Sequence, residues 1–277
     1  MSEYSEQFES STLNAKVITD LNRRRLRAKR WFLVFVALIP TGCVAIFVAL
    51  IFFPGITQSP AVIGVVLSPF VGLGGTLLML GDRSRYKRAI ASAEQGSRMG
   101  LTFIEKPKKT EYAWMRSLKC FRKPDAPVAV WNVLVGQAGG LPLSILDSGY
   151  VLGLDRNKQV FQQTVYLLGN LAGVPDFVLY PRTWLDKIGA VLSDCCVELP
   201  GNAAFNKQFA LRGDQSSVSR CYGPDLIDLC LAEKDITVEA HEGRLLACRM
   251  GQLADVAVHP QMVSWISRAA AMLTRNQ

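Results

Sequence analysis

The chain has 277 residues, a net charge of +8 and a mean hydropathy of +0.19. That hydropathy is high for a soluble domain and low for a protein that lies mostly in a membrane, so a very apolar segment must accompany an ordinary one. The basic excess is concentrated in residues 81–123, which carry a net charge of +8, whereas residues 124–277 carry a net charge of −3. The C-terminal region therefore does not have the basic character of a nucleic-acid-binding domain.

Two uncharged apolar runs follow a polar, basic segment over residues 1–30. The runs cover residues 31–53 and 61–80, and only the seven uncharged residues 54–60 separate them. As a helix the first run would be about 35 Å long, enough to cross a hydrocarbon core of about 30 Å. Helices in soluble cores rarely extend this far without a charge. The pattern over residues 31–80 therefore predicts a transmembrane helical hairpin rather than a buried helix pair.

Basic side chains flank the two runs on their outer sides, whereas the connecting turn carries no charge. The positive-inside rule then places both ends of the hairpin in the cytoplasm and the turn outside. The flanking residues are Arg23, Arg24, Arg25, Arg27, Lys29 and Arg30 before the first run and Arg83, Arg85, Lys87 and Arg88 after the second.

Each run also carries small residues at a spacing of four, which places them on one helix face. Helices in lipid associate through such faces because small side chains let the backbones approach closely. The two faces would meet in register in an antiparallel hairpin, although the face on the second run could instead form a homo-oligomer. The residues are Ala37, Thr41, Ala45 and Ala49 in the first run and Gly64, Ser68, Gly72 and Thr76 in the second.

Residues 81–123 are predicted to connect the hairpin to the C-terminal region. Their basic excess should attract anionic lipid headgroups, by about 1 kcal/mol for each Lys or Arg close to the surface. The same charges could instead serve only to fix the topology.

Short apolar runs separated by turn residues begin at residue 124. Gly139 and Gly140 lie between the first two runs, which indicates a hairpin. Glu242 and Gly243 mark a second hairpin nearer the C-terminus. We predict strands over residues 128–137, 141–153, 159–168, 176–180, 196–199, 205–211, 236–241 and 244–250.

Helices are predicted late in this region. Residues 224–234 have an apolar stripe at helical spacing, and Pro224 suits the first turn of a helix. A final helix is predicted over residues 260–274. Strands followed by late helices predict that residues 124–277 form a soluble α+β domain with a mostly antiparallel sheet.

The chain offers few residues for catalysis. Its two histidines, His241 and His259, do not form H-E-x-x-H, and no G-x-S-x-G, Walker A or G-x-G-x-x-G motif occurs. Cys195 and Cys196 are adjacent and lack the spacing of zinc ligands. We therefore expect no metal and no cofactor. A cysteine nucleophile paired with one of the histidines stays open, because such partners are distant in sequence.

Several short motifs resemble a group of uncharacterised bacterial membrane proteins that have two spans and a C-terminal domain of unknown function. The resemblance covers the spans and about residues 125–275, and it implies an architecture rather than an activity. The segments that carry it are residues 132–136 (NVLVG), 147–150 (DSGY), 163–165 (QTV), 175–181 (PDFVLYP) and 205–213 (FNKQFALRG).

These observations favour an integral protein of the bacterial inner membrane with both termini in the cytoplasm. The expected partners are the lipid bilayer, with anionic headgroups near the basic flanks, and an unidentified protein; nucleic acid is not expected. The favoured function is a non-enzymatic binding or regulatory module. A membrane-tethered hydrolase with a cysteine nucleophile and a subunit of a larger membrane complex are the alternatives.

Overall fold

The computed structural model describes residues 14–34, 36, 37, 41, 44, 84–108, 110–118, 128–152, 159–183 and 196–275. They belong to two compact units, one within Thr12–Glu94 and one within Gln95–Gln277. The first unit contains a helix over residues 14–34 and most of a helix over residues 84–98.

The predicted spans fall mostly outside the described residues. Of residues 31–80, only 31–34, 36, 37, 41 and 44 are described, and all of them are helical. Among the helices described in the chain, none combines the length and the apolar character needed to cross a bilayer.

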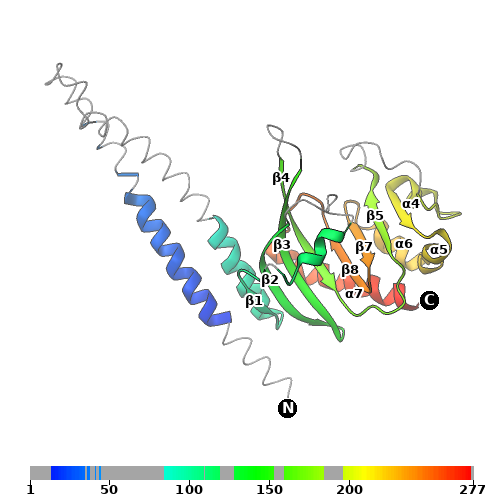
Figure 1. Cartoon of the computed structure of the whole chain (residues 1–277), viewed down its shortest axis with the longest axis horizontal. Helices are drawn as coiled ribbons and strands as arrows, with labels where there is room; N and C mark the ends of the chain where they lie inside the picture. The colour runs from blue at the N-terminus through cyan, green and yellow to red at the C-terminus, as the bar shows by residue number, and fades with distance from the viewer. Residues whose placement is uncertain are drawn as a thin grey trace, which may run out of the picture. The chain divides into compact units, whose positions relative to one another are not determined.

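The second unit is built on a sheet of eight strands in the order β1-β2-β3-β4-β8-β7-β5-β6, and all pairings between these neighbours are antiparallel (Figure 1). This confirms the predicted α+β class with an antiparallel sheet. The strands are β1 (Thr102–Ile104), β2 (Ala129–Ala138), β3 (Leu141–Leu152), β4 (Gln159–Leu168), β5 (Phe177–Pro181), β6 (Phe209–Gly213), β7 (Thr237–His241) and β8 (Arg244–Cys248).

Helical segments lie on both faces of the sheet. The 3-10 helix η1 (Ala113–Ser117) lies on one face and α7 (His259–Arg275) on the other (Figure 1). Helix α7 packs against β4 and β8 because its apolar side chains recur at helical spacing and are buried. The remaining elements are α4 (Ala203–Gln208), α5 (Gln215–Cys221), α6 (Pro224–Leu231) and η4 (Val256–Val258).

Both predicted hairpin turns are present. Gly139 and Gly140 have φ angles of 59° and 78°, and Glu242 and Gly243 have φ angles of 49° and 72°. Positive φ at both central residues is typical of the two-residue hairpin turn whose twist matches that of the flanking strands. The turn residues therefore fix the registers of β2 with β3 and of β7 with β8.

One predicted strand is wrong in its first half. Residues 205–211 were expected to be extended, but α4 includes Phe205 and the strand begins only at Phe209. Two contacts hold the helical turn: the Phe205 and Phe209 rings lie 5.3 Å apart, and the Asn206 amide bonds both the N–H and the carbonyl of Leu199 at 3.1 and 2.9 Å. Tertiary contacts outweigh local strand propensity here.

The predicted strand over residues 196–199 is also wrong. Only one bridge forms there, from Val197 to Leu211. In contrast, β1, η1 and α5 were not predicted. Both β1 and η1 precede residue 124, yet β1 pairs with β2 and Met115 of η1 is fully buried.

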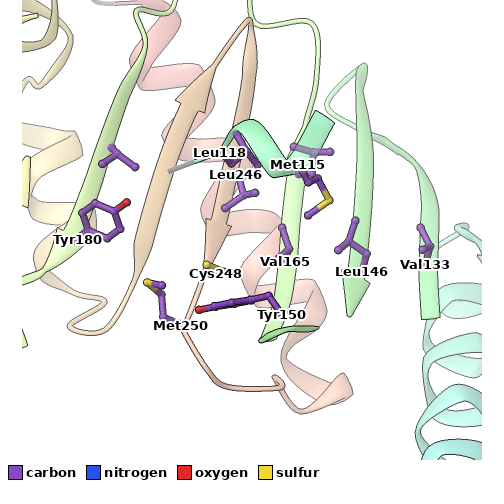
Figure 2. Packing of buried hydrophobic residues seen from close by; sticks show 12 residues of the cluster. Met115, Leu118, Val133, Leu146, Tyr150, Val165, Tyr180, Leu246, Cys248 and Met250 are labelled. Carbon is purple, nitrogen blue, oxygen red and sulfur yellow. The ribbon is translucent and has the colours of Figure 1, made fainter. Parts of the chain in front are cut away.

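An apolar cluster fills the space between η1 and the sheet. Met115 and Leu118 lie over Leu146, Val165 and Leu246, which come from three different strands (Figure 2). The burial of the Met115 and Leu118 side chains holds η1 on the sheet, and a fragment that starts at residue 124 would lack this contact.

Candidate functional site

A pocket of about 380 Å³ lies between η1 and the first residues of β2. Its position follows from the chain path. The segment after β1 leads to η1, η1 is fixed on the sheet by Met115, and β2 then begins at Ala129. Side chains from these three segments line the cavity.

The lining combines an apolar wall with three cations. Lys106, Lys108 and Arg116 contribute the charge; all three side chains are exposed, and none forms an ion pair within the described part of the chain. No carboxylate is among the described lining residues, although Glu105 and Glu111 occur in the same segment. The wall consists of Pro107, Tyr112, Ala113, Val128, Ala129 and Val130.

Tyr112 adds a polar but uncharged group to this wall. Burial raises the pKa of its phenol above the usual value of 10.0; a hydrogen bond with the Ser144 side chain opposes the shift, and the charge of Glu111 adds to it. Tyr112 therefore stays neutral at physiological pH, and the three cations set the charge of the pocket. An anion with an apolar part is the ligand that such a lining suits.

A second polar cluster is buried within the sheet. Asp147 on β3 accepts a hydrogen bond from Asn132 Nδ2 at 3.0 Å and another from Thr164 Oγ1 at 2.9 Å, and Thr164 Oγ1 accepts from the N–H of Ala254 at 2.9 Å. Asn132, Asp147 and Thr164 belong to the short motifs at residues 132–136, 147–150 and 163–165. The cluster ties β2, β3 and β4 to the segment before η4, which indicates a structural role.

Most sequence-predicted basic residues that the structure describes are exposed. Arg23, Arg24, Arg27, Lys29 and Arg30 are exposed on the first helix, where Arg24 pairs with Asp20, and Arg25 is half-buried. On the second helix Arg85 and Lys87 are exposed and Arg88 is half-buried. Arg83 lies outside the described residues.

Little of the predicted hairpin contact can be located. Ala37 and Thr41 are helical, and the Thr41 hydroxyl donates to the Ala37 carbonyl at 2.9 Å, which satisfies that hydroxyl within its own helix. The other predicted packing residues, Ala45, Ala49, Gly64, Ser68, Gly72 and Thr76, lie outside the described residues.

Three of the described cysteines are buried. Burial raises the pKa of Cys230 to about 12 and raises those of Cys248 and Cys221 as well. A nucleophilic thiol needs the opposite shift. Cys196 is half-buried, and Cys43, Cys120 and Cys195 lie outside the described residues.

Each histidine is engaged with another side chain. His259 is buried and its Nδ1 lies 2.9 Å from Tyr166 Oη, whereas Nδ1 of the partly exposed His241 lies 2.8 Å from Asp176 Oδ2. Within the described ranges, no group of three His, Cys, Asp or Glu side chains is arranged to hold a metal ion.

Comparison of the chain with known proteins found no relative. No model of a protein family matches the chain, no curated protein matches it, and no solved structure matches it.

Proposed function

We propose that this chain is a membrane-anchored module on the cytoplasmic side of a bacterial inner membrane, and that it binds a ligand or partner rather than catalysing a reaction. The observation that carries the binding function is the basic pocket beside η1, which combines three cations with an apolar wall. The two uncharged runs at residues 31–53 and 61–80 and their basic flanks support the anchor.

Protease accessibility tests the topology. Protease added outside intact spheroplasts should leave residues 124–277 uncut, and the same protease should cut them after the membrane is opened. Cleavage of this region in intact spheroplasts would contradict the proposed orientation, and release of the chain by alkaline carbonate would contradict the anchor.

The hairpin contact is a finer part of this proposal. If the small residues of the two runs face each other, Thr41 and Gly72 lie at the same depth. On a background without native cysteines, Thr41→Cys with Gly72→Cys should cross-link within one chain, and Thr41→Cys with Leu73→Cys should do so far less. Cross-linking of Gly72→Cys only to a second copy would instead indicate an oligomer interface.

Iodoacetamide labelling distinguishes this proposal from a cysteine hydrolase. In the native full-length chain in mild detergent, Cys221, Cys230 and Cys248 should react slowly, because burial raises the pKa of each thiol. One fast-reacting cysteine whose labelling also abolishes a hydrolytic activity would favour the enzyme.

A further inference from the structure

We propose that the basic pocket binds the headgroup and glycerol end of an anionic phospholipid. The inference rests on the proposed function, because it takes the ligand from the bilayer in which the chain is anchored. It assigns a site at Lys106, Lys108 and Arg116, apart from the basic residues that flank the two uncharged runs.

Charge is the first argument. The described lining holds three cations and no carboxylate, so an anion gains attraction from each side chain without opposing repulsion inside the pocket. Arg116 can bond a phosphate through two N–H groups at once, whereas Lys106 and Lys108 act as point charges. A phosphodiester provides both the negative charge and the acceptor oxygens that these three residues can use.

The apolar wall separates a phospholipid from a free anion. Val128, just before β2, Val130 of β2 and Ala113 of η1 offer surface that inorganic phosphate cannot use. A ligand with apolar groups next to its phosphate gains free energy from covering this surface. The volume of about 380 Å³ lies in the range of small-molecule pockets, and it suits the polar end of a lipid rather than its whole acyl region.

The chain path supports the bilayer as the source. Only 25 residues separate Leu80, the last residue of the second uncharged run, from Lys106. Fifteen of them form the helix over residues 84–98, which spans about 22 Å. The pocket is therefore tethered close to the membrane by a short segment, which gives bilayer lipids a high local concentration.

Native mass spectrometry of the full-length chain in a non-ionic detergent tests the proposal. The probes are phosphatidylglycerol and phosphatidylcholine with the same acyl chains. The first variant, Lys106→Gln/Lys108→Gln/Arg116→Gln, removes the pocket charges. Its control, Lys207→Gln/Lys234→Gln/Arg268→Gln, removes three exposed cations elsewhere in the second unit. Circular dichroism spectra should show that both variants retain the fold.

A second variant, Ala129→Phe, tests the cavity itself. Ala129 is an exposed strand residue that lines the pocket, and a Phe there would add bulk at the lining while leaving every charge in place. Its control is Val160→Phe on β4, where the native side chain is 66% exposed and does not line the pocket.

We expect the wild-type chain to bind phosphatidylglycerol at least tenfold more tightly than phosphatidylcholine. Each cation contributes about fivefold, so the pocket-charge variant should lose at least tenfold in phosphatidylglycerol affinity while its control loses less than threefold. Ala129→Phe should lose at least fivefold, and Val160→Phe should bind like the wild type.

Three outcomes would overturn the proposal. The first is equal affinity for the two lipids, and the second is equal losses in a pocket variant and its control. The third is displacement of phosphatidylglycerol by inorganic phosphate at a similar concentration, which would indicate a site for free phosphate. Binding in detergent does not depend on topology, so a failed anchor would appear in the carbonate extraction and a failed lipid site in these measurements.

Discussion

Two carboxylates in the second unit accept several hydrogen bonds each, but they lie in opposite surroundings. Asp147 is 2% exposed and accepts from Asn132 and Thr164 within the sheet. Asp214 is exposed and its Oδ2 accepts from the backbone of Ser217 and from the hydroxyls of Ser216 and Ser217 at the start of α5. Water can replace the partners of Asp214 but not those of Asp147. The number of hydrogen bonds alone therefore does not rank the two sites by stabilisation.

Removing the buried carboxylate should have the largest effect. Asp147→Ala leaves Asn132 Nδ2 and the Thr164 hydroxyl without this acceptor in the sheet interior, which should lower the free energy of unfolding by about 3 kcal/mol. Thermal unfolding of the full-length chain in detergent measures the change. Asp147→Asn, which keeps one acceptor oxygen, should lose less.

The control for this prediction is Asp176→Ala. Asp176 bonds His241 and the N–H of Glu242, but its side chain is 58% exposed, so the change should cost less than about 1 kcal/mol. Equal losses at Asp147 and Asp176 would contradict the proposed importance of burial.

The residue before Asp214 tests the backbone rather than the hydrogen bonds. Gly213 has a φ angle of 154°, and an added Cβ would lie 2.6 Å from Val218 Cγ2 and 2.9 Å from the Asp176 carbonyl oxygen. Gly213→Ala should therefore destabilise the chain by about 2 kcal/mol. Gly201→Ala, at a φ angle of 78° with open space around it, is the matched control and should cost about 1 kcal/mol. If Gly213→Ala lost less stability than Gly201→Ala, Val218 and the Asp176 carbonyl would be shown to move away from the added Cβ at little cost.

The buried Tyr166–His259 pair should have an intermediate effect. Tyr166→Phe removes the partner of His259 Nδ1 and leaves that nitrogen buried, at a cost of about 1–2 kcal/mol. The double variant Tyr166→Phe/His259→Leu removes both polar groups, so its loss in thermal unfolding should be smaller than the sum of the single losses of Tyr166→Phe and His259→Leu. Additive losses would show that the two side chains do not interact.

The sequence predicted the parts of the fold that rest on local signals. The β2–β3 and β7–β8 hairpins carry turn residues that tolerate positive φ, and α7 has apolar side chains at helical spacing. The strand predicted at Phe205 and Asn206 was wrong because the conformation of these residues depends on their contacts with Phe209 and Leu199. The helix η1 was not predicted, because a five-residue segment held on the sheet by Met115 and Leu118 has no periodic pattern of its own.

The candidate site could be predicted only in part. Lys106 and Lys108 belong to the basic excess over residues 81–123, from which contact with anionic lipid was expected. The pocket itself requires η1 to lie next to β2, which brings Arg116 and Val130 to one cavity. That proximity is a tertiary property, and no spacing in the sequence indicates it.

The smallest expected effect concerns Asp214 and depends on pH. The hydrogen bonds from the side chains of Ser216 and Ser217 and from the Ser217 backbone lower the pKa of Asp214 from 3.8 to about 2. A carboxyl whose pKa is lower in the folded state stabilises the fold above its unfolded pKa, and it loses this contribution as the pH falls from about 4 toward 2.

Comparison with Asp214→Asn isolates this contribution, because Asn also caps a helix N-terminus but does not titrate. At pH 5 the wild type should unfold at a slightly higher temperature than Asp214→Asn, and the difference should shrink as the pH approaches 2. The difference should be small because Asp214 is exposed, and it should exceed that seen for Asp225→Asn, whose carboxylate lies in the first turn of α6. If the difference in unfolding temperature stays constant between pH 5 and pH 2.5, the charge of Asp214 does not stabilise α5. The hydrogen bonds of Asp214 would then stabilise the fold equally whether the carboxyl is charged or neutral.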